Sequence, residues 1–315
     1  MRSWRIIAVI TAGFFLGLPT GHALGSRPQR APWLMAILGD SIAAATLADL
    51  PIPDAPTPEE SVLAWRDQGY EAEWIYTNKR KLSWGSGEAL RSHYVLLREW
   101  MARNEPGQSL EALNVAVPGS TTADLKDQVH RVLTALHSGN YRGLKYLAFT
   151  IGSNDACSGG DSNLLSDSVR RNLEEALTAL WKGIPRGTPL RVLVVGAPRI
   201  PNLGTPAFLR AQTLFGLSCS TVRDHLLRMC TPLTVWTGND QYLERLAIVE
   251  RVNASLRSTA LELESAFPGL EVAYSDRLFQ LEIPLGALAA DCFHPGKWAQ
   301  ELISTQTWRD QPWFR

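Results

Sequence analysis

Hydrophobic residues occur along this chain in short uninterrupted runs, separated by longer stretches in which they recur at helical spacing. The runs are nearly continuous rather than alternating, which is typical of parallel strands covered on both faces. Strands of this kind that alternate with helices predict a single α/β domain, doubly wound and three-layered, with a mainly parallel five-stranded sheet. The predicted strands cover residues 33–38, 113–117, 144–151, 190–195 and 270–274.

The stretches between the runs carry apolar residues three or four positions apart, which predicts amphipathic helices. In one of them Leu125, Val129, Val132 and Leu136 fall on a single face. The predicted helices cover about 122–136, 164–181, 243–267 and 295–308.

Two long segments, about 50–84 and 198–241, interrupt this alternation. Long insertions at the carboxyl ends of strands usually build a substrate pocket. The first insertion is rich in proline and aromatic residues, which fits either an apolar acyl pocket or, equally, a satellite core. Its aromatic residues are Trp65, Tyr70, Trp74, Tyr76 and Trp84.

The N-terminus has the pattern of a secretory signal peptide. A basic segment at 1–5 precedes an apolar run at 6–18, and small residues lead up to Ala23. We therefore expect a signal peptide at 1–23, an exported protein that is periplasmic or secreted, and one folded domain at 24–315. The apolar run is short for a transmembrane helix, so an uncleaved anchor is the weaker alternative.

The composition of the 315 residues is that of an ordinary globular protein, with 45% hydrophobic residues. The 31 basic and 31 acidic residues balance to a net charge of zero. A neutral chain lacks the basic footprint expected of a nucleic-acid-binding protein. We therefore expect no nucleic-acid partner, and no feature of the chain indicates an obligate protein partner.

Export makes disulfides possible, and the chain has four cysteines, Cys157, Cys219, Cys230 and Cys292. Four cysteines allow three pairings, and the sequence does not choose among them. Cys219 and Cys230 are close enough to close a small loop, whereas a bond between Cys157 and Cys292 would join two candidate catalytic segments. The spacing is not that of a zinc site, so we expect no metal.

Ser41 and His294 are the candidate nucleophile and base. Ser41 follows the first predicted strand, and the alanines after it favour a helix whose N-terminus would stabilise negative charge. The alternative is that Ser41 only caps this helix. His294 comes three residues after Asp291, which can orient the imidazole if the segment forms a tight turn. The alternative is a surface histidine before Pro295.

Two other predicted strand ends offer hydrogen-bond donors for an oxyanion. Gly119 follows the second strand and can present a bare backbone N–H group, unless it is a simple turn glycine. Asn154 follows the third strand and offers a side-chain amide, unless it forms a helix cap or an Asx turn. Both donors are therefore expected near Ser41, because the carboxyl ends of parallel strands share one edge of the sheet.

These blocks in this order resemble the SGNH hydrolases, also called the GDSL esterase/lipase family, over nearly the whole chain after the signal peptide. The pattern is Gly39-Asp40-Ser41, then Gly119, then Gly152-x-Asn154-Asp155, then Asp291-x-x-His294. The local sequences at 82–85, 114–119, 152–157 and 291–294 look like the phospholipase B-like branch of that family. The usual α/β-hydrolase motif Gly-x-Ser-x-Gly is missing from the sequence.

The resemblance implies a flavodoxin-like fold and a serine ester hydrolase that works through an acyl-enzyme without metal or organic cofactor. Ser41, His294 and Asp291 would form the triad, and Ser41, Gly119 and Asn154 the oxyanion hole. The implied substrate is a small-molecule or lipid ester of the lipase or (lyso)phospholipase type, with transient contact to a lipid surface. The alternatives are a carbohydrate acetylesterase of the same fold, acyl transfer to an acceptor other than water, and an inactive binding protein.

Overall fold

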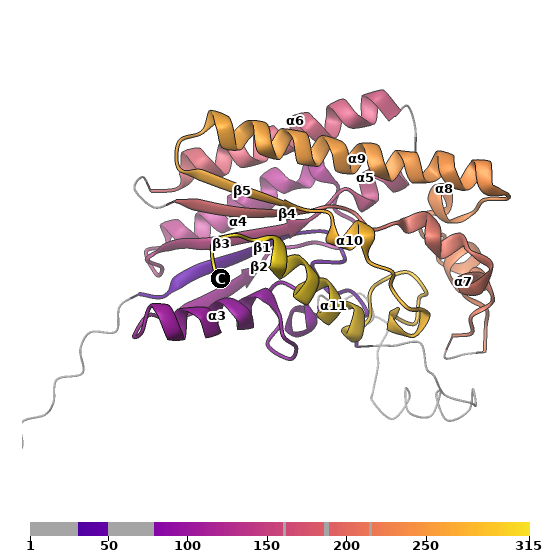
Figure 1. Ribbon diagram of the computed structural model, residues 1–315, viewed down its shortest axis with the longest axis horizontal. Helices are drawn as coiled ribbons and strands as arrows, with labels where there is room; N and C mark the ends of the chain where they lie inside the picture. The colour runs from indigo at the N-terminus through magenta and orange to yellow at the C-terminus, as the bar shows by residue number, and fades with distance from the viewer. Residues whose placement is uncertain (1–30, 50–78, 160–161, 186–188, 214–215) are drawn as a thin grey trace, which may run out of the picture.

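The computed structural model describes residues 31–49, 79–159, 162–185, 189–213 and 216–315 (Figure 1). The predicted signal peptide at 1–23 and most of the insertion at 50–84 lie outside these residues, so the predicted domain boundaries stay a prediction. Among the helices described, none is long and apolar enough to cross a membrane.

The five predicted strands form one parallel sheet with the order β2-β1-β3-β4-β5. This order is that of a flavodoxin-like doubly wound sheet and confirms the predicted fold class. The apolar runs are strands buried on both faces, since β1 and β3 are almost wholly buried. The strands are β1 (Trp33–Gly39), β2 (Leu110–Asn114), β3 (Gly143–Thr150), β4 (Leu190–Val195) and β5 (Leu270–Ser275).

The second strand lies three residues earlier than predicted, at Leu110–Asn114 instead of 113–117. The chain continues beside β1 past its end, because the N–H groups of Val115 and Val117 donate to carbonyls of β1. The N–H group of Ala116 donates instead to the Asn114 side chain. Because β2 is an edge strand, this N–H group faces away from β1 and has a local side-chain acceptor. A hydrophobic run does not reveal where the regular strand ends.

Helices cover both faces of the sheet (Figure 1). One face packs against the longest helices and forms the larger core, and the other packs against helices from early and late in the chain. The predicted helices are confirmed within a few residues. On the first face lie α4 (Leu125–His137), α6 (Ser162–Gly183) and α9 (Asn239–Ala266), and on the second α3 (His93–Asn104) and α11 (Lys297–Thr307).

Shorter elements gather at the carboxyl ends of the strands, where Figure 1 shows α7 and α8 beyond the sheet. The short α-helices are α5 (Ser153–Cys157), α7 (Pro206–Arg210), α8 (Thr231–Thr234) and α10 (Arg277–Gln280). A π-helical segment spans Ser220–Leu226, and 3-10 turns span Arg80–Leu82, Thr122–Asp124, Ile200–Gly204, Leu285–Ala287 and Trp308–Asp310.

The helix predicted to begin at Ser41 is not formed, and residues 41–49 make consecutive turns instead. Ala45 and Leu47 have φ angles of 55° and 56°, a left-handed conformation that interrupts a right-handed helix. Tertiary contacts override the helix propensity of the alanines, since the carbonyl of Ala43 accepts hydrogen bonds from side chains of two other segments. Ser41 therefore does not stand at the N-terminus of a helix.

Candidate active site

Three of the predicted site residues line one cavity of about 530 Å³ at the carboxyl ends of the strands. Ser41 comes from the turns after β1, Asn154 from α5 directly after β3, and His294 from the loop that precedes α11. This is the edge at which doubly wound sheets bind their ligands. The strand order brings the three together, since β1 and β3 are neighbours in the sheet.

Asp291 and His294 form a hydrogen-bonded pair within one tight turn. Nδ1 of His294 lies 2.5 Å from Oδ2 of Asp291. The other carboxylate oxygen, Oδ1, accepts from the backbone N–H groups of Phe293 and His294, each at 3.0 Å. Cys292 takes a φ of 60° inside this turn. Because Nδ1 bonds the carboxylate, Nε2 is the ring nitrogen that remains for chemistry.

The pair shifts both pKa values in the sense that favours opposite charges. Burial lowers the pKa of His294, but the charge and hydrogen bond of Asp291 and the charge of Asp40 outweigh it, so the pKa lies above its usual value. Burial raises the pKa of Asp291, but His294 and the two backbone N–H groups outweigh it and lower the pKa. The histidine therefore sits in a site that stabilises its protonated form.

Asp40 lies fully buried beside Ser41 and holds the start of the turns. Its Oδ1 accepts from the N–H group of Ile42 at 2.9 Å. Burial raises the pKa of Asp40 to about 7, although that N–H group and the charge of His294 act in the opposite direction. Asp40 is thus a structural carboxylate whose charge is felt by the histidine.

Asn154 and Gly119 are joined through Ser120. Nδ2 of Asn154 donates to the Ser120 carbonyl at 2.9 Å, so one amide proton holds the two strand-end loops together. Gly119 is exposed with a φ of 83° and does not line the cavity. Within the described part of the chain, the backbone N–H groups of Ser41 and Gly119 donate to no other residue.

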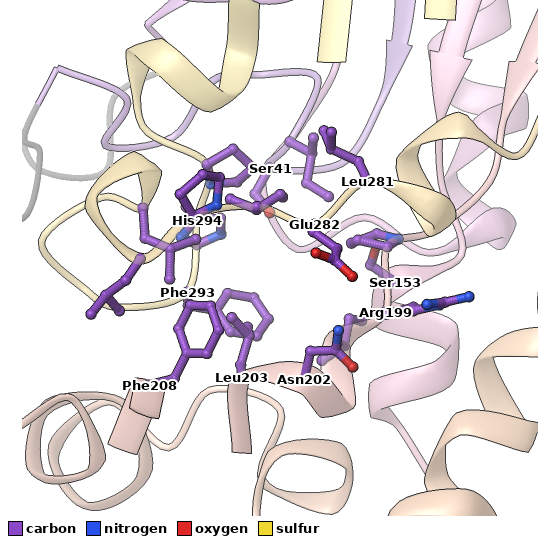
Figure 2. Close-up of a pocket in the computed structure, with 18 of the residues that line it drawn as sticks. Ser41, Ser153, Arg199, Asn202, Leu203, Phe208, Leu281, Glu282, Phe293 and His294 are labelled. Carbon is purple, nitrogen blue, oxygen red and sulfur yellow. The ribbon is translucent and has the colours of Figure 1, made fainter. Parts of the chain in front are cut away.

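The cavity is lined mostly by apolar side chains, and several of its polar side chains gather on one side, below Leu281 in Figure 2. Figure 2 shows Ser41 beside His294, with Phe293, Leu203 and Phe208 on one side of them. Ser153, Arg199 and Glu282 lie on the other side, and the Glu282 carboxylate points into the cavity (Figure 2). The guanidinium of Arg199 stacks on Phe279 at 4.7 Å from the ring centroid, and its Nε has no partner in the described chain.

The two predicted insertions differ in their relation to the cavity. The segment at 198–241 supplies one wall, through residues from Pro198 to Phe208. In the segment at 50–84, Trp84 is completely buried in the core on the other face of the sheet and does not line the cavity. For Trp84 the core alternative holds, and the other aromatic residues of that segment lie outside the described residues.

Two disulfides join the second insertion to the site, and they pair Cys157 with Cys230 and Cys219 with Cys292. Neither the small loop from Cys219 to Cys230 nor a direct bond between Cys157 and Cys292 is formed. Cys157 ends α5, which carries Asn154, and Cys292 lies between Asp291 and His294. The segment 219–230 is thus bonded to both loops.

Sequence reasoning missed part of the cavity wall and the buried amides behind Ser41. Residues Leu281, Ile283, Leu285 and Leu288 line the cavity, and their alternating apolar pattern between β5 and Asp291 was the available signal. The buried polar side chains Asn114, Gln128 and Gln300 hold the backbone around Ser41. A lone polar residue in an apolar stretch gives no hint of its partner.

The fold and site agree with the family to which the sequence belongs. The GDSL-like Lipase/Acylhydrolase family matches residues 35–306, most of the chain, so the protein is a member of this family of ester-hydrolysing enzymes. No curated protein matches the chain.

Three similar solved structures are distant. LAE5, an alpha/beta hydrolase enzyme from the metagenome of Lake Arreo, is 15% identical with a TM-score of 0.46, over 90% of this chain and 97% of that one. TesA is 16% identical with a TM-score of 0.43, over 89% and 98%. A catalytic mutant of Axe2, an acetylxylan esterase from Geobacillus stearothermophilus, is 13% identical with a TM-score of 0.46, over 90% and 96%. None of these similarities indicates a substrate.

Proposed function

We propose that this protein hydrolyses carboxylic esters through an acyl-enzyme on Ser41. The observation that carries the proposal is the Asp291–His294 pair, which opens on the same cavity as Ser41 and Asn154. A serine hydroxyl becomes a competent nucleophile when a positioned base takes its proton, and the base needs a third group to orient it. Ser41, His294 and Asp291 supply the three residue types, and the orienting contact between Asp291 and His294 is present.

In the proposed reaction the Ser41 hydroxyl oxygen bonds to the ester carbonyl carbon while His294 takes the hydroxyl proton. The oxyanion accepts hydrogen bonds from the backbone N–H groups of Ser41 and Gly119 and from the second amide proton of Asn154. His294 then protonates the leaving alcohol. Water then attacks the acyl-enzyme and gives a proton to His294, which passes it to the Ser41 oxygen as the acid leaves.

The cavity supports an acyl group longer than acetyl. Its volume of about 530 Å³ lies within the range of roughly 300–1,000 Å³ in which proteins bind ligands many atoms larger than acetate. We assign the acyl chain to the apolar side formed by Leu203, Phe208 and Phe293, and the leaving group to the side of Arg199 and Glu282. The apolar side supports a lipase or (lyso)phospholipase substrate over an acetyl ester, and the local sequences support the phospholipase B-like branch.

The test of the reaction is Ser41→Ala together with labelling by a fluorophosphonate probe. The proposal expects that turnover of nitrophenyl esters falls by roughly a millionfold and that the probe labels the unchanged protein on Ser41. Ser304→Ala is a matched control, because Ser304 is also buried, does not line the cavity, and its hydroxyl donates to the Arg91 carbonyl away from the site. Wild-type turnover by Ser41→Ala would refute the triad, and an unlabelled native protein would favour the binding-protein alternative.

The test of the substrate is a series of nitrophenyl esters from acetyl to long acyl chains, followed by lysophospholipids. A preference for the longer chains is expected, and widening the cavity by Phe208→Ala should move the optimum to longer chains still. Activity on acetyl esters alone would support the carbohydrate acetylesterase. Product analysis with an added alcohol separates hydrolysis from acyl transfer.

Export and transient contact with a lipid surface belong to the same proposal. The two disulfides support an oxidising compartment, because such bonds form and persist outside the cytosol. The expected mature protein begins at Leu24, which N-terminal sequencing of the exported protein checks. Flotation with phospholipid vesicles checks the contact with lipid.

A further inference from the structure

The carbonyl groups next to Ser41 are held by side chains from distant parts of the chain. The turns at 41–49 lack a regular helical hydrogen-bond ladder. Within them the N–H group of Ala45 donates to the Ile42 carbonyl at 3.2 Å, and side chains supply further donors. Nε2 of Gln300 donates to the Ile42 carbonyl at 3.0 Å. The Ala43 carbonyl accepts from Oγ of Ser83 at 2.7 Å and from Nδ2 of Asn114 at 2.9 Å.

Gln300 differs from the other donors because it belongs to α11, the helix that follows His294 in the chain. It lies in the first turn of α11, which begins three residues after His294. The side chain is completely buried, and its Oε1 accepts from the N–H group of Trp84 at 2.9 Å. The same helical turn makes a second contact with the Ser41 segment, since the N–H group of Lys297 donates to the Ala48 carbonyl at 2.7 Å.

We infer that Gln300 is a positioning residue that sets the place of Ser41 relative to His294, by tying the turn after the nucleophile to the helix that begins just after the base. The inference rests on the proposed function, because it requires proton transfer between these two side chains. Ile42 is adjacent to Ser41, so a shift of its carbonyl moves the nucleophile directly. Displacements of about 1 Å in such geometry cost roughly a hundredfold in rate.

The experiment compares Gln300→Met with Gln306→Met. Methionine keeps the length of the buried side chain and removes both hydrogen bonds, whereas Gln306 lies on the same helix and, among the described side chains, forms a hydrogen bond with Arg309 only. For Gln300→Met we expect kcat on nitrophenyl esters to fall roughly 10- to 100-fold with little change in KM. The rate of fluorophosphonate labelling should fall in parallel. Gln306→Met should behave as the unchanged protein does.

A second variant keeps the test decisive if Gln300→Met does not fold. Glutamate at 300 can always accept from the N–H group of Trp84, but it can donate to the Ile42 carbonyl only when protonated. Burial favours the protonated form. The ratio of kcat for Gln300→Glu to that of the unchanged protein should therefore rise as the pH falls, at a temperature at which both are folded.

The inference is overturned if Gln300→Met is folded with unchanged kcat and labelling rate, or if kcat of Gln300→Glu is reduced by a factor that does not depend on pH. Ser41→Ala in the same assay separates the two claims. An active Ser41→Ala refutes the proposed function itself. An inactive Ser41→Ala with a fully active Gln300→Met refutes only the positioning role.

Discussion

The loop that carries Ser41 and the loop that carries Asp291 and His294 meet at one cavity but are held in place by different means. The histidine loop is held locally, by the Asp291 carboxylate within its own turn, by backbone hydrogen bonds across its base and by the disulfide from Cys292. The serine loop has buried side chains of distant segments as its supports, among them Gln128, Asn114 and Gln300.

The comparison shows two ways to fix the position of a catalytic side chain: contacts within its own loop, or buried side chains from other segments. The histidine loop depends on few other residues, because the Asp291 carboxylate lies within it and one disulfide, from Cys292 to Cys219, ties it to the rest of the chain. A loop held by buried amides depends on correct packing of three separate elements, because each amide is placed by its helix or strand. We therefore expect the histidine loop to fail through changes within it, and the serine loop to fail through changes in the surrounding structure.

Asp291→Asn should have the largest effect on the histidine loop, a loss of about 10⁴-fold in kcat, the scale seen when the acid of a serine triad becomes an amide. The amide group would face Nδ1 and favour the wrong tautomer of His294, which then cannot accept the Ser41 proton. Steady-state kinetics on nitrophenyl esters measure the loss. Asp276→Asn, at the end of β5, is a matched control, and a loss below tenfold in Asp291→Asn would contradict the orienting role.

Gly39→Ala should have the largest effect on the serine loop, lowering the free energy of unfolding by about 3 kcal/mol or more. Gly39 has a φ of 129°, and a Cβ atom there would lie 2.2 Å from the Thr150 carbonyl oxygen. Urea denaturation measures the effect. Gly107→Ala is the control, since Gly107 has a φ of 80° and open space around it, and equal losses in both would argue against a backbone clash.

Removing the disulfides one at a time tests whether the bond at Cys292 is what holds the histidine loop. Both close loops with a sequence separation of 73 residues, so the entropic stabilisation of about 2–4 kcal/mol should be alike for the two. Cys219→Ser with Cys292→Ser should in addition alter the pH profile of kcat/KM, because it frees the turn that carries His294. Cys157→Ser with Cys230→Ser should leave that profile unchanged, and identical profiles in the two variants would show that the bond at Cys292 does not control the histidine.

Asp40→Asn should have the smallest effect of these variants, a shift in the pH profile of kcat/KM. In the unchanged protein kcat/KM falls with falling pH, as His294 gains its proton at a pKa above its usual value. The charge of Asp40 contributes to that raised pKa, so its removal should lower the pKa of His294 and move the acid limb to lower pH. Asparagine can still accept from the N–H group of Ile42. A pH profile that does not move, or moves upward, would contradict this coupling.

The sequence predicted the sheet and the position of each motif, because both depend on local patterns. A buried parallel strand must be apolar along its whole length, and the residue after it must lie at the sheet edge. The turns after Ser41 were predicted as a helix, because alanine propensity was the only local information and contacts with Ser83 and Asn114 decided against it. Likewise, aromatic character left open whether Trp84 lines a pocket or packs in a core, and the structure places it in the core.

By itself, then, the sequence determined the doubly wound fold, the family and the residue types of the candidate site. Only the tertiary structure decided which cysteines pair, which face of the insertion at 198–241 lines the cavity, and which amides hold Ser41 in place. The physical reason is the distance along the chain between the residues that interact. Strands and turns follow from neighbours a few positions apart, whereas the contact between Gln300 and Ile42 joins residues 258 positions apart and exists only once the sheet has brought both ends of the chain to one edge.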